Sequence, residues 1–395
     1  MHTLVTARRI ESIDLLRGIV IVLMALDHVR DYFHADSFLF DPTDITQTNI
    51  LIFLTRWVTH FCAPVFIFLA GTSMYIVSKR KSKAEVSAFL LKRGFWLIVL
   101  EFTVMNFAWF FNVHFSLFTL QVIWVIGLSM VCMAAIIHLP FRAILWFGII
   151  LVVGHNLLDG IQVTQPGYRA LWAVLHQFDF FPGVLGDRTI ILVYPLIPWV
   201  GVMSLGYCLG ALYVNDFDAG LRKKILHYTG LIATALFILF RFINIYGDPS
   251  PRVTEGSFII QFMSFLNVSK YPPSMLYLFM TLGPALLFLA HSENLKNKIT
   301  SNLVIFGRVP MFFYILHVYV IHLFALIAAQ LTGFGWQSFL LERFPTMDPN
   351  LQGYGFSLGV TYLVWIAVVL VTFPLCRWYN NYKSNHREKW WLSYL

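Results

Sequence analysis

The chain has 395 residues, of which 58% are hydrophobic, 17% are aromatic and only 12% are charged. Soluble domains carry about 25% charged residues, so this composition excludes an ordinary soluble protein with a polar surface. The formal net charge of +8 does not require a nucleic-acid partner, because basic loops beside anionic lipid headgroups account for it.

Long apolar segments predict an all-α, polytopic integral membrane protein. About 20 apolar residues cross the hydrocarbon core of a bilayer, and residues 120–137 include only one Gln and one Ser among otherwise apolar residues. We expect a single transmembrane domain over residues 1–395. Its spans, about ten in number, are predicted at 12–33, 50–78, 85–108, 116–138, 141–159, 190–213, 222–246, 272–292, 304–331 and 354–379.

The distribution of Lys and Arg predicts that both termini are cytoplasmic. With that orientation, most of the 28 Lys and Arg residues fall in inner loops or at the inner ends of spans, as the positive-inside rule describes. Arg8 and Arg9 then lie inside, and we expect the first span to be retained rather than cleaved. The loop 35–49 is expected outside.

The first span ends in a group of ionisable residues, in the stretch LDHVRDYFHAD at 26–36. At 1.5 Å per residue, Asp27 and His28 lie about 22–24 Å along the helix, near the outer edge of the hydrocarbon. His28 and Asp31 share one helical face, and Asp27 and His34 flank Asp31. A carboxylate can fix the tautomer of a histidine and keep its pKa in the range that a general base needs. We therefore select His28, His34, Asp31 and Asp27 as candidate catalytic residues; an interfacial polar collar is the alternative.

Other spans also carry ionisable residues. Arg56 and His60 lie roughly 9 and 15 Å deep on one face of the second span, Glu101 lies in the outer half of the third, and His317 lies beyond the midplane of the ninth. Ionisable groups inside a membrane indicate functional sites. We predict that these four residues bind substrate or stabilise charge. An Arg56–Glu101 ion pair between helices is the structural alternative.

The inner ends of the spans offer cations instead. Arg17, Lys92, Arg93 and Arg308 lie there, which predicts an anionic ligand from the cytoplasm, with Arg17 and Arg308 among its contacts. The four cysteines have no metal-ligand spacing and no paired extracellular set, so no metal site is expected.

Four blocks of sequence are distinctive: RIESIDLLRGIVIVLMALDHVRDYFH, RWVTHFCAPVFIFLAGTSMYI, YPLIPWVGVMSLGYCLG at 194–210 and GRVPMFFYILHVYVIH at 307–322. They resemble the heparan-α-glucosaminide N-acetyltransferase catalytic domain family. The first block is also similar to the Arg-x10-His pattern of the broader transmembrane acyltransferases, with Arg17 and His28 at its ends. By the same resemblance, His34 matches the catalytic histidine of the lysosomal enzyme.

The resemblance implies an acetyl-CoA-dependent transmembrane acyltransferase. An acyl group, expected to be acetyl, would move from cytoplasmic acyl-CoA to a sugar amine or hydroxyl on the extracytoplasmic side, with a His base supported by Asp. Acetyl-CoA is then a co-substrate and no bound cofactor is expected. The expected location is the bacterial cytoplasmic membrane. The acceptor, the choice between N- and O-acylation and the oligomeric state stay open.

A secondary transporter is the alternative function. Intramembrane Asp, His and Arg would also suit a proton-coupled carrier of an anionic or sugar-like solute. Such carriers commonly contain inverted repeats with broken helices at corresponding positions. The proline-interrupted segments of this chain, at 64, 195–198 and 272–273, do not fall symmetrically.

Overall fold

The structure is a computed structural model that describes residues 10–184, 186–214, 216–386 and 388–393. It is 71% helix and 5% strand, which confirms the helical class. The α-helices are α1 (Glu11–Phe33), α2 (Ile50–Val58), α3 (Cys62–Ser78), α4 (Lys83–Leu100), α5 (Asn106–Phe110), α6 (Val122–Ile136), α7 (Phe141–Gly154), α8 (Pro166–Leu175), α9 (Leu196–Leu209), α10 (Ala219–Ile243), α11 (Phe258–Leu266), α12 (Met275–Ser292), α13 (Lys298–Arg308), α14 (Pro310–Leu331) and α15 (Leu358–Asn385).

Seven helical segments within these described ranges are long and apolar enough to cross a membrane. The other three predicted spans fall on α1, on α4 with α5, and on α6. Both α1 and α4 carry several charged residues, and α6 has only 15 residues; the number of ten crossings therefore stays a prediction. The seven segments are Ile50–Ser78, Phe141–Leu158, Leu196–Tyr213, Ala219–Ile243, Met275–Ser292, Pro310–Leu331 and Leu358–Asn385.

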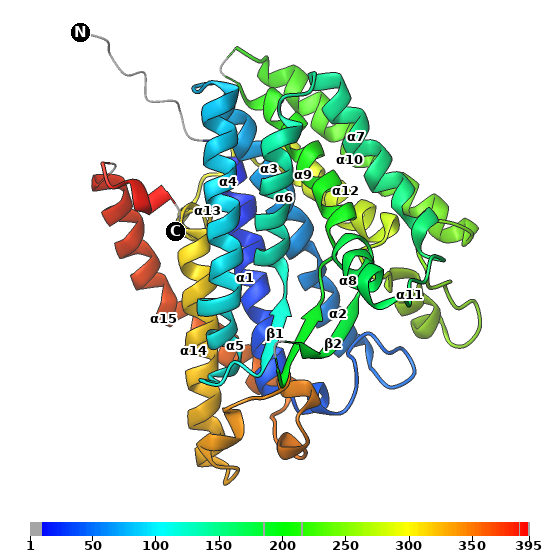
Figure 1. The fold of residues 1–395 in the computed structure, drawn as a ribbon, viewed down its shortest axis with the longest axis vertical. Coiled ribbons are helices and arrows are strands. Elements are labelled where there is room, and N and C mark those ends of the chain that lie inside the picture. The colour runs from blue at the N-terminus through cyan, green and yellow to red at the C-terminus, as the bar shows by residue number, and fades with distance from the viewer. Residues whose placement is uncertain (1–9, 185, 215, 387, 394–395) are drawn as a thin grey trace.

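A three-stranded sheet departs from the all-α prediction. Strand β3 (Arg188–Leu192) pairs in parallel with β1 (Leu117–Leu120) and antiparallel with β2 (Asp179–Val184). The predicted spans 116–138 and 190–213 therefore began too early. Strands β1 and β3 each run almost directly into an apolar helix, α6 and α9, so composition alone does not separate strand from helix. The sheet lies between α5 and α8 in Figure 1.

The predicted span 304–331 consists of two helices, because Pro310 has no backbone N–H to continue α13 and begins α14 instead. Helices α1 and α13 cross without room for a side chain: a Cβ on Gly307 would lie 1.8 Å from the carbonyl oxygen of Asp14. This crossing brings Arg308 within 3.7 Å of the Asp14 carboxylate, to which Arg17 also bonds at 3.2 Å.

Helix α1 ends at Phe33, one residue before the second candidate base. His34 has an extended backbone conformation (φ −82°, ψ 124°), and the amide of the next residue, Ala35, donates to the carbonyl oxygen of Phe356 at 3.0 Å. The start of α1 and the end of α15 lie at the same end of the molecule (Figure 1). The predicted inner cations Arg8 and Arg9 lie outside the described residues.

Candidate functional site

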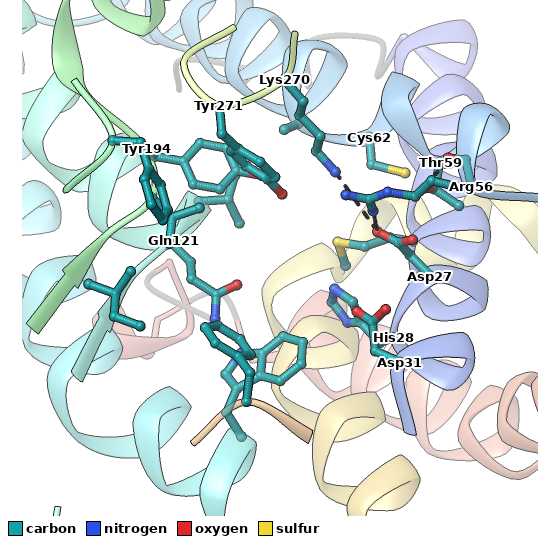
Figure 2. A pocket seen from close by; sticks show the side chains of 18 of the residues that line it. Asp27, His28, Asp31, Arg56, Thr59, Cys62, Gln121, Tyr194, Lys270 and Tyr271 are labelled. Atoms are coloured by element: carbon teal, nitrogen blue, oxygen red, sulfur yellow. Dashed lines mark hydrogen bonds and ion pairs between the residues drawn. The ribbon is translucent and has the colours of Figure 1, made fainter. Parts of the chain in front are cut away.

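A cavity of about 570 Å³ lies beside the last turns of α1. Figure 2 shows charged side chains from α1, α2 and the loop before α12 on one wall, facing the rings of Tyr194 and Tyr271 across the space. We call it the outer cavity, because the predicted orientation puts it in the outer half of the membrane. Its wall includes Asp27, His28, Asp31, Arg56, Trp109, Gln121, Phe178, Phe180, Tyr194, Lys270, Tyr271, Tyr314 and Phe344.

His28 is hydrogen-bonded to a second histidine from a distant helix. Its Nδ1 lies 2.8 Å from Nε2 of His317 in α14, and the two rings stack with centroids 5.0 Å apart. The Nδ1 of His317 lies 2.9 Å from the carbonyl oxygen of Phe313, which can only accept. A neutral His317 therefore carries its hydrogen on Nδ1 and accepts at Nε2. His28 then donates from Nδ1, and its own Nε2 keeps the lone pair.

Asp27 is buried at the centre of a charged cluster. Its Oδ2 forms an ion pair with Arg56 and lies 3.9 Å from Nζ of Lys270, while Oδ1 lies 2.8 Å from Arg30. Arg30 also binds Asp31, at 2.6 Å. Buried charges are tolerated when they are paired in this way, so the cluster fixes the end of α1 beside His28.

Two predicted pairings differ in the structure. Asp31 was expected to orient His28 from the same helical face, but within the described part of the chain its partner is Arg30, because a neighbouring guanidinium attracts a carboxylate more strongly than a neutral imidazole does. The alternative Arg56–Glu101 ion pair is wrong, since Arg56 pairs with Asp27. Glu101 begins a π-helical turn (Glu101–Met105) and accepts the backbone N–H of Gln121 at 3.0 Å.

Two of the predicted histidines lie away from the lining of the outer cavity. His34 lines a separate pocket together with Asp36, Asn49 and Ser357. His60 is buried between α2 and α3, where its Nδ1 lies 3.0 Å from the carbonyl oxygen of Trp57. The structure thus brings Asp27, His28, Asp31, Arg56 and His317 together and leaves His34, His60 and Glu101 outside this group.

A second cavity, of about 290 Å³, lies further toward the start of α1. We call it the inner cavity. Its cations are Arg17, Arg93, Arg308 and Lys383, and the guanidinium of Arg17 also donates to Ser73 Oγ at 3.2 Å. Four residues line both cavities and form a thin shared wall: Met24, Phe66, Val122 and Tyr314.

Several residues that line these cavities were not selected from the sequence, among them Lys270, Tyr271 and Lys383. Lys270 and Tyr271 lie in a loop without a recognisable motif, and Lys383 lies near the C-terminal end of α15. Their only sequence signal was charge or aromatic character next to an apolar span. Among the described residues, no group of three or more His, Cys, Asp or Glu side chains is arranged to hold a metal ion.

Comparison with known families gives a match over more than half of the chain. A family model described as "Heparan-alpha-glucosaminide N-acetyltransferase, catalytic" matches residues 9–246. That range contains three of the four residues of the shared wall, Met24, Phe66 and Val122. It ends before Lys270, Tyr314 and His317. No curated protein matches the sequence.

Proposed function

Because the chain belongs to the heparan-alpha-glucosaminide N-acetyltransferase catalytic family, a family of membrane acetyltransferases, we propose that its two cavities bind the two substrates of one reaction. The proposed reaction moves an acyl group, expected to be acetyl, from acyl-CoA in the inner cavity to a carbohydrate amine or hydroxyl in the outer cavity. The observation that carries the proposal is the thin wall of Met24, Phe66, Val122 and Tyr314 between the cavities.

The inner cavity suits the donor. Coenzyme A carries three phosphate groups, and Arg17, Arg93, Arg308 and Lys383 gather in one cavity at the predicted cytoplasmic end. Arginine matches phosphate geometry with paired donors. The apolar residues between this cavity and His28 would accommodate the uncharged acyl-pantetheine arm. A donor bound in this way comes from the cytoplasm and presents its thioester to the outer cavity.

His28 supplies the base in this proposal. Its Nε2 would take a proton from the acceptor amine or hydroxyl as that group attacks the thioester carbonyl carbon. A new C–N or C–O bond then forms and the C–S bond breaks, and the departing thiolate receives a proton. The ion pairs of Asp27 hold the helix turn that carries His28, so the carboxylate supports the base by position rather than by direct contact.

The outer cavity suits a carbohydrate acceptor. Ligand pockets commonly combine an apolar and aromatic lining with a few polar groups that fix orientation. Here Trp109, Tyr194 and Tyr271 supply rings, and Gln121 supplies an amide that lies toward the middle of the space in Figure 2. The charge bias of the loops supports an orientation in which the acceptor is extracytoplasmic. We further propose that the membrane is the bacterial cytoplasmic membrane.

The test uses purified protein in lipid nanodiscs with labelled acetyl-CoA and a panel of amino sugars and glycans, read by mass spectrometry. His28→Ala should lower turnover roughly 10²–10⁴-fold, while the dissociation constant for CoA stays nearly unchanged. His34→Ala is the matched control, because His34 lines a different pocket; its turnover should stay near that of the wild type.

Two results would contradict the proposal. Equal loss of turnover in the His34 and His28 variants would contradict the assignment of His28 as the base, because that assignment depends on His28 alone of the two lining the outer cavity. Movement of an intact solute across the bilayer, without thioester cleavage, would favour the transporter alternative, for which a wall between two cavities is also a suitable geometry.

A further inference from the structure

The charged cluster of the outer cavity contains an excess cation. We infer that the ammonium group of Lys270 is an electrostatic catalytic group, which binds the thioester carbonyl oxygen as negative charge develops on it during acyl transfer. The inference rests on the proposed function and deepens it. It concerns a residue beyond the range that matches the family model.

The charged cluster contains more cations than carboxylates. The ion pairs join three cations, Arg30, Arg56 and Lys270, to two carboxylates, Asp27 and Asp31. Counting only these described side chains, the cluster has one positive charge more than it can neutralise. An uncompensated charge in a low-dielectric site is costly, and it attracts a negative charge when one forms nearby.

Of the three cations, Lys270 is the one least tightly paired. Arg30 is buried and lies between both carboxylates at 2.8 and 2.6 Å, and Arg56 forms a close pair with Asp27. Lys270 is more loosely held, with Nζ 3.9 Å from Asp27, and its side chain lines the cavity. The excess charge is therefore available at Lys270, on the same wall as His28 (Figure 2).

The neighbouring tyrosine reports the same local field. Burial raises the pKa of the Tyr271 phenol, yet Lys270, Arg56 and a hydrogen bond from Tyr194 together bring it below its ordinary value. Cations that lower the pKa of this phenol would also stabilise the oxygen anion of a tetrahedral intermediate, because both cases place one negative charge on an oxygen beside the same cations.

The chemical step balances without any further reactant. The acceptor transfers its proton to His28 Nε2 as its lone pair bonds to the carbonyl carbon, and the C=O π electrons move to the oxygen facing Lys270. When the C=O bond re-forms, the C–S bond breaks and the proton passes from His28 to the thiolate. Lys270 neither gives nor takes a proton in these steps, and its role is to lower the energy of the oxyanion.

The experiment uses hydroxylamine as a small neutral acceptor, which gives acetohydroxamate and free CoA, beside the best carbohydrate acceptor. Lys270→Met should lower kcat about 10²-fold with both acceptors, with the dissociation constant for CoA unchanged. Lys270→Arg should keep most of the activity, because it keeps the charge. Lys224→Met, which removes an exposed lysine of α10, is the matched control and should leave both rates unchanged.

Three results would overturn the inference. Loss with the carbohydrate but not with hydroxylamine would mean that Lys270 binds an anionic group of the acceptor. Thioester cleavage that survives Lys270→Met with both acceptors would remove Lys270 from the reaction while leaving the proposed function intact. A wild-type protein that binds CoA but cleaves no thioester with either acceptor would overturn the proposed function, and this inference with it.

Discussion

The hydrogen bond between His28 and His317 decides which ring nitrogen of His28 is available to a substrate. The hydrogen-bond chain ends at the backbone carbonyl oxygen of Phe313, which accepts from His317 and so fixes the hydrogen of that ring on Nδ1. His28 must then donate through its own Nδ1. A neutral imidazole thus takes the orienting place that is usually filled by a carboxylate or a backbone carbonyl. His317 is therefore expected to act by positioning His28.

Substitution of His317 tests this positioning role. His317→Ala should lower turnover about 10–100-fold, the range typical for removing a group that orients a metal-bound histidine. His317→Gln should recover part of the loss, because its side-chain carbonyl oxygen can accept the same N–H from His28. CoA affinity should stay unchanged in both variants. Equal losses for Ala and Gln, accompanied by a lower unfolding temperature, would instead indicate that His317 is a packing residue.

At the level of helices, the crossing of α1 and α13 positions the inner cations. Gly18 and Gly307 face each other's helix, and a Cβ on either one would come within 2 Å of a backbone oxygen, at 1.9 and 1.8 Å respectively. Backbone atoms cannot rotate away as a side chain can, so the helices must separate to admit a methyl group. Arg308 directly follows Gly307 and would move with it.

Gly307→Ala should therefore destabilise the protein by about 1–3 kcal/mol and weaken CoA binding. Thermal unfolding in detergent and equilibrium binding of CoA measure the two effects. Gly154→Ala is the control, because no atom lies within 4 Å of a Cβ at that position of α7. Normal stability and normal CoA affinity in Gly307→Ala would mean that α1 and α13 are less closely packed in the membrane.

In the protein as a whole, the inner and outer cavities follow one another along α1. The inner cavity gathers cations and the outer cavity is lined by His28, so the helix that begins at Glu11 connects both sites. Access of a cytoplasmic donor and an extracytoplasmic acceptor would then depend on the orientation of the protein in the bilayer.

Cysteine labelling in intact cells tests this orientation. In a background without the four native cysteines, Lys81→Cys should not react with a membrane-impermeant maleimide, because the basic loop is predicted inside. Gln47→Cys, in the loop predicted outside, should react. Both positions are exposed, so burial does not explain a difference. The opposite labelling pattern would reverse the proposed sides of donor and acceptor.

Local properties of the chain predict the helical class, the apolar segments and part of the candidate site. Apolar length and the distribution of charge predicted a helical membrane protein and the seven segments that are long enough to cross. They also located Asp27 and His28 near one end of the first helix and Arg17 at the other. These inferences succeed because hydropathy and helical spacing depend on neighbouring residues alone.

Which side chains pair with one another is decided by the tertiary structure. His28 and His317 are 289 residues apart, and only the packing of α14 against α1 brings their rings together. Packing likewise adds Lys270 to the cluster around Asp27, while the end of α1 at Phe33 turns His34 into another pocket. Hydrogen bonds and ion pairs depend on distances of a few ångströms between elements, and no spacing along the chain encodes those distances.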